Sequence, residues 1–399
     1  MAGTQNWISV SWGDHLEFGE GEGRLDTPDK LRKRAEVWSK ELGVQTILWR
    51  ENRTRRDGWV YQAGRDPRPV SDVRPDWDEF ETVCRAGRQL GSRVYLYVTL
   101  FDEGWPLPSD NIRQNSHHNA YHARDVSWQS DFSRSHPEFT VVDRSGRIRQ
   151  WGVLCLAYLE VRDEFRRRYA TLLSQGDFDG LFVCLRSQSK PADFADQFGF
   201  NPPVVTAYRD RYSVDILRED FDLQAWRNLQ GDFLTRFLWE LRELTRKSGV
   251  RLAVGAPRGD VIGPPLGNGT LAWETWARSG LIDELIIDQN SSRCPSTWLD
   301  LWPMHRGDGY LENYLTGQNQ PTLREHLTRR YQPALQPTET NLLLARQWSE
   351  SDPVAEAELL DLPCVHGLVF SSFRFDNAGI LHSADWRPRG ERLRGRPAA

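Results

Sequence analysis

The chain has 399 residues, of which 39% are hydrophobic and 27% charged, and its formal net charge is −5. This composition supplies enough apolar side chains for a large core and excludes an intrinsically disordered chain. The negative net charge argues against general affinity for nucleic acid, so we expect no nucleic-acid partner.

The first residues, from Met1 to Trp7, lack the basic start and apolar core of a signal peptide. No apolar run approaches the roughly 18 residues that span a bilayer. We therefore expect a cytoplasmic protein that does not contact a membrane.

Five cysteines are scattered singly along the chain, without the CxxC spacing of a zinc site or a redox motif. Cys155 and Cys184 lie within apolar runs. We predict reduced packing residues, no metal and no cofactor. The five are Cys84, Cys155, Cys184, Cys294 and Cys364.

Four times an amphipathic helix pattern runs into a glycine and then into a short apolar strand, at Gly43, Gly91, Gly249 and Gly280. Glycine suits the left-handed residue that ends a helix, so the pattern predicts repeated helix-to-strand units. In the helix before Gly43, Thr27 is the expected cap and Pro28 the first helical residue.

Eight predicted strands alternate with helices in this chain, which predicts a (β/α)8 barrel, a TIM barrel of the α/β class, over residues 1–386. A doubly wound open sheet is the alternative, but no glycine-rich dinucleotide turn follows the first strand. Residues 387–399 form a basic tail. The predicted strands are 6–12, 45–50, 93–100, 180–186, 251–258, 283–288, 340–346 and 367–373.

Two long insertions are expected, at about 101–160 after the third strand and at 187–222 after the fourth. Loops of this length are usually functional, and the loops that follow the strands build the active site of a barrel.

Arginine ends five of the eight strands, which apolar packing alone does not require. Each could pair with an acidic neighbour on the rim of the barrel, as Arg50 with Glu51 or Arg258 with Asp260. Several could instead bind a substrate anion, because a guanidinium binds a carboxylate bidentately. The predicted anion ligands are Arg50, Arg186, Arg258, Arg346 and Arg374, with Gln188 beside them.

Carboxylates at the strand ends are the candidate acids and bases for glycoside cleavage. Asp14 is the first candidate because it follows the first strand directly, and Asp102, Glu103 and Asp288 come next. The glutamate pair that many retaining barrels carry after strands four and seven is absent.

Histidines lie on the insertion after the third strand, and His136 is a candidate general acid or base because its unperturbed pKa of about 6.5 suits proton transfer. His118 and His122 have metal-like spacing, but no nearby acidic ligand or helical pattern supports a site. With His117, they are expected to be surface residues.

Seventeen tryptophans are more than a chain of this length usually carries. Trp12 and Trp348 lie near strand ends and could stack on the apolar face of a sugar ring. Packing between the insertions and the barrel is the alternative explanation for such tryptophans.

Three segments resemble the family-10-like glycoside hydrolases of environmental bacteria. They are "HPEFTVVDRSGRIRQWGVLCLAYLEVRDEF" (136–165), "FDGLFVCLRSQS" (178–189) and "ADQFGFNPPVVTAYRDRYSVDI" (195–216). The resemblance is specific over 136–260 and looser elsewhere. It implies a (β/α)8 barrel and carbohydrate substrates.

By position, Asp14, His136 and Arg186 also resemble an inverting sialidase family on the same fold. That family uses an aspartate after the first strand, a histidine from the insertion after the third, and arginines around the sugar carboxylate. The resemblance implies an acidic sugar whose carboxylate Arg186 binds. Arg186 and Arg346 have no acidic residue as an immediate neighbour, so we expect both to bind the carboxylate in an inverting, exo-acting hydrolase.

Two alternatives use the same residues: a lyase or phosphate-ester enzyme acting on another anion, and a carbohydrate-binding barrel without turnover. A homodimer is a further possibility, although nothing in the sequence indicates one.

Overall fold

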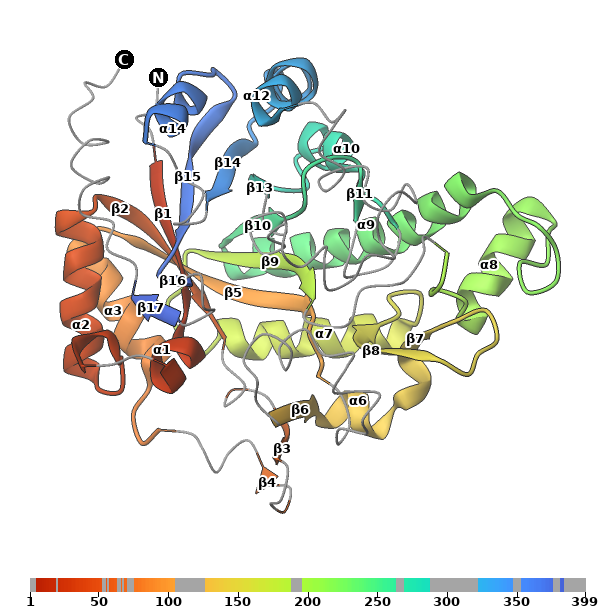
Figure 1. Ribbon diagram of the computed structural model, residues 1–399, viewed down its shortest axis with the longest axis horizontal. Coiled ribbons are helices and arrows are strands. Elements are labelled where there is room, and N and C mark those ends of the chain that lie inside the picture. Colours follow the sequence, from red (N-terminus) through yellow and green to blue (C-terminus); the bar gives the residue numbers. More distant parts are fainter. Residues whose placement is uncertain are drawn as a thin grey trace.

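The computed structural model describes residues 5–18, 21–51, 55, 57–62, 66, 68–69, 75–104, 126–187, 196–262, 269–287, 322–346, 353–375 and 381–383. Figure 1 shows strands at the centre of the molecule, with helices around them.

Eight parallel strands close into a barrel, which confirms the predicted (β/α)8 architecture and excludes the open sheet. Each strand pairs with the next along the chain, and the last pairs with the first. In this order they are β1 (Gln5–Ser11), β2 (Val44–Arg50), β5 (Arg93–Phe101), β9 (Gly180–Ser187), β10 (Arg251–Gly255), β13 (Glu284–Ile287), β14 (Asn341–Arg346) and β15 (Val365–Ser371).

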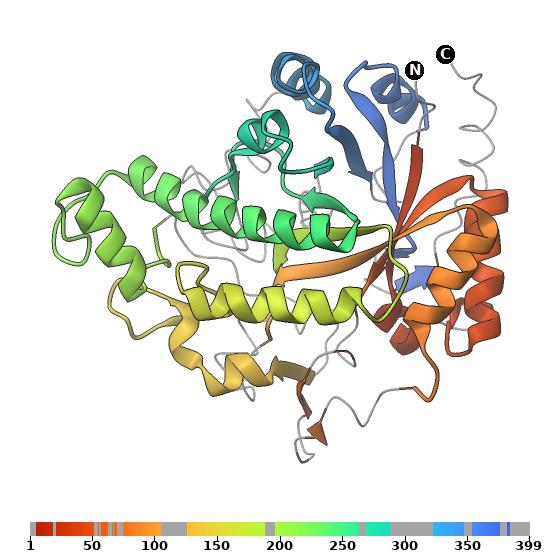
Figure 2. The ribbon, with the colours of Figure 1, turned by 180° about the vertical axis from the view of Figure 1, so that it is seen from behind.

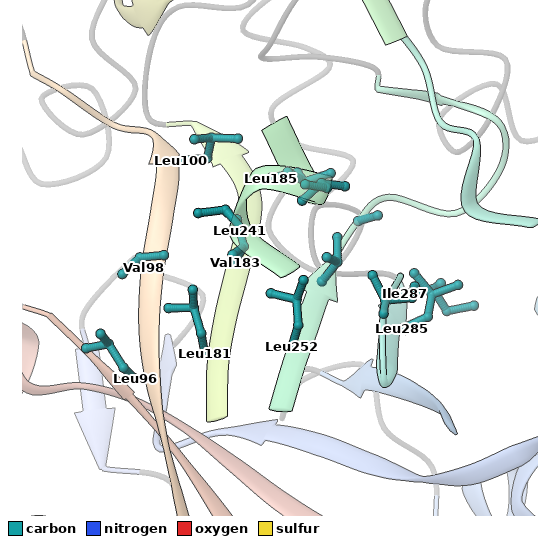
Figure 3. Packing of buried hydrophobic residues seen from close by; sticks show 14 of the residues in the cluster. Leu96, Val98, Leu100, Leu181, Val183, Leu185, Leu241, Leu252, Leu285 and Ile287 are labelled. Atoms are coloured by element: carbon teal, nitrogen blue, oxygen red, sulfur yellow. The ribbon is translucent and has the colours of Figure 1, made fainter. Parts of the chain in front are cut away.

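Side chains alternate between the inside and the outside of the barrel, as a pleated strand requires. The inner cluster includes Trp7, Tyr95, Tyr97 and Phe182, all at most 1% exposed. The outward residues form a second, larger cluster with the helices, and Figure 3 shows Leu241 of a covering helix among strand residues such as Val183 and Leu252.

Helices cover the barrel, and Figures 1 and 2 show α7 and α9 along one side and α2 and α3 on another. The predicted helix at 224–247 is α9, whose buried face includes Trp226, Phe233 and Phe237. The covering helices are α2 (Pro28–Glu36), α3 (Glu79–Leu90), α7 (Leu159–Leu173), α9 (Leu223–Ser248), α10 (Trp273–Arg278), α12 (Leu323–His326), α13 (Gln332–Leu335) and α14 (Pro353–Leu360).

The predicted helix boundaries are confirmed. Thr27 caps α2 by accepting from the amide of Lys30, and Pro28 is its first residue. All four glycines predicted to end helices have left-handed φ angles, from 65° to 71°; they are Gly43, Gly91, Gly249 and Gly280.

The insertions form small antiparallel sheets and short helices beyond the strand ends. After β5 come β6 (Val126–Ser130), α6 (Asp131–Ser135), η5 (Pro137–Phe139), β7 (Thr140–Val142) and β8 (Arg149–Leu154), and after β9 comes α8 (Pro202–Tyr212). The sequence did not reveal an insertion after β2, whose β3 (Gly58–Gln62) and β4 (Arg68–Pro69) pair into one sheet with β6.

A polar cluster closes the end of the barrel at which the strands begin. Glu284 is fully buried, and its Oε1 accepts from Arg251 Nε at 2.6 Å and from the Tyr95 hydroxyl at 3.2 Å. Burial raises the pKa of Glu284 to about 7, although Arg251 opposes the shift. In a barrel this end usually serves stability.

Four cysteines are free and buried, as predicted, and Cys294 lies outside the described residues. Among the residues that the structure describes, no helix is long and apolar enough to cross a membrane. The described residues also contain no group of three His, Cys, Asp or Glu side chains that could hold a metal ion.

Candidate active site

The candidate site is the mouth of the barrel, where all eight strands end. Charged residues follow one another around much of this rim: Arg346 ends β14, Asp14 lies just beyond β1, Arg50 ends β2 and Asp102 follows β5. Arg186, on β9, comes next. Cations and carboxylates therefore alternate around the arc of neighbouring strands from β14 to β9.

Arg50 and Asp102 form an ion pair between the ends of the neighbouring strands β2 and β5, with Nη2 2.8 Å from Oδ2. Their side chains are 14% and 7% exposed, so the pair is partly open to solvent. The guanidinium also lies 5.8 Å from the centre of the Tyr97 ring, which faces the barrel interior. Arg50 thus pairs with the carboxylate that directly follows the neighbouring strand β5, whereas the sequence offered Glu51.

Arg346 contacts a carboxylate more loosely. Its Nε lies 4.0 Å from Oε1 of Glu356 in α14, beyond hydrogen-bonding distance. Among the described residues the same Nε is buried without an acceptor, while the side chain as a whole remains 15% exposed. A buried guanidinium N–H without an acceptor costs free energy, and an oxygen of a ligand could relieve that cost.

Arg258 is half-buried just beyond β10. Asp260, which the sequence offered as its rim partner, forms an ion pair with Arg330 at 2.9 Å and accepts from the indole of Trp273. Arg374 lies in β16 (Phe373–Phe375), opposite His382 of β17 (Leu381–Ser383).

Glu103 was a candidate acid, but the structure makes it a buried structural residue. Its side chain is fully buried, and its carboxylate accepts two bonds from Arg168 of α7, at 2.6 and 3.1 Å, and one from the Ser130 hydroxyl at 2.5 Å. Its backbone bonds to Ser130 and Gly152. Glu103 therefore joins β5, β6, β8 and α7, and a substrate cannot reach it without disrupting them.

His136 was the predicted partner of Asp14, and the structure does not bring the two together. It lies at the end of α6, with its side chain 45% exposed, its Nδ1 3.1 Å from Glu138 Oε1 and its ring stacked on Phe139. Figure 1 shows α6 well apart from α1 (Trp12–Phe18), the helix that carries Asp14. A catalytic role for His136 stays a prediction, but the placement of α6 does not favour a direct partnership with Asp14.

Trp12 was a candidate for sugar stacking, but it is fully buried. Its indole donates to the carbonyl of Leu25 at 2.8 Å, and its ring packs on Trp49 and Trp77. Trp12 therefore anchors α1 to the barrel, which is the packing explanation that the sequence had left open.

Sequence reasoning gave no role to His15, the neighbour of Asp14. Its ring is 1% exposed and contacts the carbonyl of Gly23 and the hydroxyl of Ser372. A histidine directly after a strand was visible in the sequence, but its two partners come from a turn and from the end of the last strand.

Structural contacts account for residues of the segments that carry the family-10-like resemblance. Asn201 stands at the N-cap position of α8, and its side chain donates to the carbonyl of Thr140 and accepts from the amide of Val142. Arg162 donates to the carbonyl of Leu156 and to Glu240. These residues hold the insertion against the barrel.

Several predicted site residues have no described side chain. The backbones of Asp14, Arg186 and Arg374 belong to described elements, but their side chains do not. Wholly outside the described residues lie Gln188, Asp288, Trp348, the trio His117, His118 and His122, and the basic tail 387–399.

No protein-family model matches the chain, and a comparison with curated proteins finds no match. Solved structures do match. The glycoside hydrolase domain of PgaB (BpsB) from Bordetella bronchiseptica is 13% identical with a TM-score of 0.52, and the match covers 98% of each chain. The β-galactosidase from the psychrophilic Marinomonas ef1 is 10% identical with a TM-score of 0.53.

The galactosidase match covers 99% of this chain but 62% of the galactosidase, so this chain corresponds to part of that protein. The family-10-like and sialidase resemblances stay predictions, since neither is among these matches. At identities this low, structural similarity establishes a shared fold and not a shared function. What the comparisons show is therefore a (β/α)8 barrel shared with structures of glycoside hydrolases.

Proposed function

We propose that the protein is a glycoside hydrolase that inverts the anomeric centre and removes an acidic sugar, of sialic-acid-like or uronic type, from the end of a chain. The supporting observation is the alternation of arginines and carboxylates around the mouth of the barrel. Arginines suit a sugar carboxylate, and a pair of carboxylates suits proton transfer to and from the glycosidic bond.

Asp14 and Asp102 are the proposed carboxylate pair, and Asp102 replaces His136 as the partner of Asp14. The two follow β1 and β5, which are separated in the barrel by β2 alone. Two strand spacings of about 4.8 Å separate the ends of β1 and β5 by roughly 9–10 Å. Inverting enzymes hold their carboxyl groups about 6.5–9.5 Å apart, which leaves room for water, so the proposal requires the two side chains to lean slightly toward each other.

In this mechanism Asp14 donates a proton to the leaving oxygen and Asp102 accepts one from the attacking water. Arg50 donates to Oδ2 of Asp102 and so fixes the orientation of that carboxylate. Water attacks the face of the sugar opposite the leaving group, which inverts the configuration in one displacement.

Arg346 and Arg186 are the proposed ligands of the sugar carboxylate. Arg346 has a buried Nε to which no residue in the described part of the chain offers an acceptor, and its ion pair with Glu356 is long at 4.0 Å. Arg186 is the penultimate residue of β9, which pairs with β5, the strand that Asp102 follows. An anion bound between them would direct the anomeric carbon toward Asp14 and Asp102.

The test is a panel of aryl glycosides of acidic and neutral sugars, with Asp14→Asn, Asp102→Asn and Arg346→Gln compared with wild type. The two Asp variants should lower kcat by about 10²-fold or more, and Arg346→Gln should raise KM for acidic sugars only. Asp260→Asn is the matched control, because it also breaks an Asp–Arg pair that follows a barrel strand.

Full activity of Asp14→Asn and Asp102→Asn would refute the assignment. Tight sugar binding without turnover would indicate a carbohydrate-binding barrel. Inhibition by low concentrations of phosphate, without any glycoside turnover, would indicate a phosphate-ester enzyme instead.

A further inference from the structure

The side chain of His15 joins three separate parts of the barrel mouth. It lies on α1, and its Nδ1 is 2.9 Å from the carbonyl oxygen of Gly23 in η1 (Gly21–Gly23). Its Nε2 is 2.9 Å from the hydroxyl of Ser372, directly after β15. The amide of Ser372 in turn donates to the carbonyl of Ser9 in β1.

The partners define the tautomer of the neutral ring. A carbonyl oxygen only accepts hydrogen bonds, so Nδ1 carries the proton and donates to Gly23. Nε2 is then an acceptor, and the Ser372 hydroxyl donates to it. The ring also meets Trp38 edge to face, with ring centres 6.3 Å apart.

A serine that donates to a histidine oriented by a third group resembles an activated nucleophile. Burial argues against that role, because Ser372 is 3% exposed and His15 is 1% exposed. An acyl or glycosyl group attached to the Ser372 hydroxyl would need space that the packed side chains fill. The same burial suits a fixed support.

Asp14 lies between two anchors of its own helix. Trp12, two residues before it, is held by Leu25 and by the tryptophans around it, and His15, the next residue, is held by Gly23 and Ser372. A helix of seven residues has little stability by itself, so tertiary contacts must hold it in place.

We propose that His15, held by Ser372 and Gly23, is a positioning residue that sets α1, and with it Asp14, at the barrel mouth. This inference rests on the proposed function of Asp14. Displacing a reacting group by about 1 Å can cost about 10²-fold in rate, so loss of both hydrogen bonds should appear mainly in kcat.

The experiment compares His15→Phe, which keeps an aromatic ring and removes both hydrogen bonds, with His15→Gln, which can still accept from Ser372. Ser372→Ala and Ser372→Thr form the second pair. The control is Ser92→Ala, which removes a buried hydroxyl bonded to Val44 at the opposite end of the barrel. Each variant is measured for kcat, for KM on the aryl glycosides, and for hydrogen exchange of the amides in 12–18.

His15→Phe should lower kcat about 30-fold with KM within about threefold of wild type, and exchange in α1 should rise. His15→Gln and Ser372→Thr should restore much of the loss, and Ser92→Ala should change neither readout. In the Asp14→Asn background, His15→Phe should have little further effect on kcat, because both substitutions act through the carboxyl group of residue 14.

Two results would overturn the inference. One is wild-type kcat and wild-type exchange in His15→Phe. The other is an undiminished effect of His15→Phe in the Asp14→Asn background. Full activity of Asp14→Asn alone would instead refute the proposed function, so the two failures are distinguishable. If no glycoside is turned over, unchanged exchange of α1 in His15→Phe still refutes the positioning role.

Discussion

Replacing Glu103 with glutamine should destabilise the protein rather than impair its chemistry. The change removes the negative charge that faces Arg168 while keeping the shape of the side chain. Removing one partner of a buried ion pair costs about 3–5 kcal/mol, because the other charge stays buried without compensation. Glu164, 3.5 Å from Arg168 Nη2, retains part of the compensation, so we expect a loss near the lower end, about 3 kcal/mol.

Urea unfolding followed by tryptophan fluorescence measures this loss, and kcat is measured under conditions in which the variant is fully folded. Asp163→Asn, which breaks the exposed pair with Arg166 on α7, is the matched control and should cost less than about 1 kcal/mol. Adding Arg168→Met to Glu103→Gln should cost less than the sum of the single changes. Wild-type stability combined with a hundredfold loss of kcat would refute the structural role of Glu103.

Three further outcomes follow from the described residues. The folded-state pKa of Glu284 is about 7, above its usual value of 4.5. The contribution of Glu284 to the free energy of unfolding is therefore complete below about pH 4.5 and is lost as the pH rises through 7. Urea titrations over this range should show the free energy of unfolding fall by up to about 3 kcal/mol, and Glu284→Gln should abolish that fall. The four described cysteines are buried, so a thiol reagent at pH 8 should rapidly modify at most Cys294 in the native protein. After denaturation it should modify all five cysteines. Fast reaction of two or more thiols in the native protein would contradict the packing. Gly104→Ala should unfold at a clearly lower urea concentration. Gly104 has a φ of 74°, and an added Cβ would lie 1.9 Å from the carbonyl oxygen of Trp128. An unchanged urea midpoint would contradict this close approach.

The barrel could be predicted from the sequence because its signals are local. Each glycine that ends a helix, and each apolar run after it, reports a helix-to-strand unit within a few residues of chain. The insertion after β2 was missed because β3 finds its partner, β6, more than 60 residues further along the chain. No local pattern reports such a pairing.

The site was harder to predict for the same reason. The position of Arg50 at a strand end was correct, but its partner Asp102 depends on which strands become neighbours. Neighbouring residues of one sequence, Asp102 and Glu103, have different roles because the chain turns between them: one faces the mouth and the other is buried against α7. The burial of Trp12 and the position of His136 could not be predicted, because exposure and direction follow from tertiary packing, which residue type does not specify.

The configuration of the first-formed sugar tests the central proposal most directly. Proton NMR follows the product anomer as the enzyme cleaves an aryl glycoside of an acidic sugar, before the free sugar mutarotates. An inverting reaction that needs both Asp14 and Asp102 gives the anomer opposite to that of the substrate. Release of the same anomer, or no turnover of any acidic glycoside, would contradict the proposed mechanism.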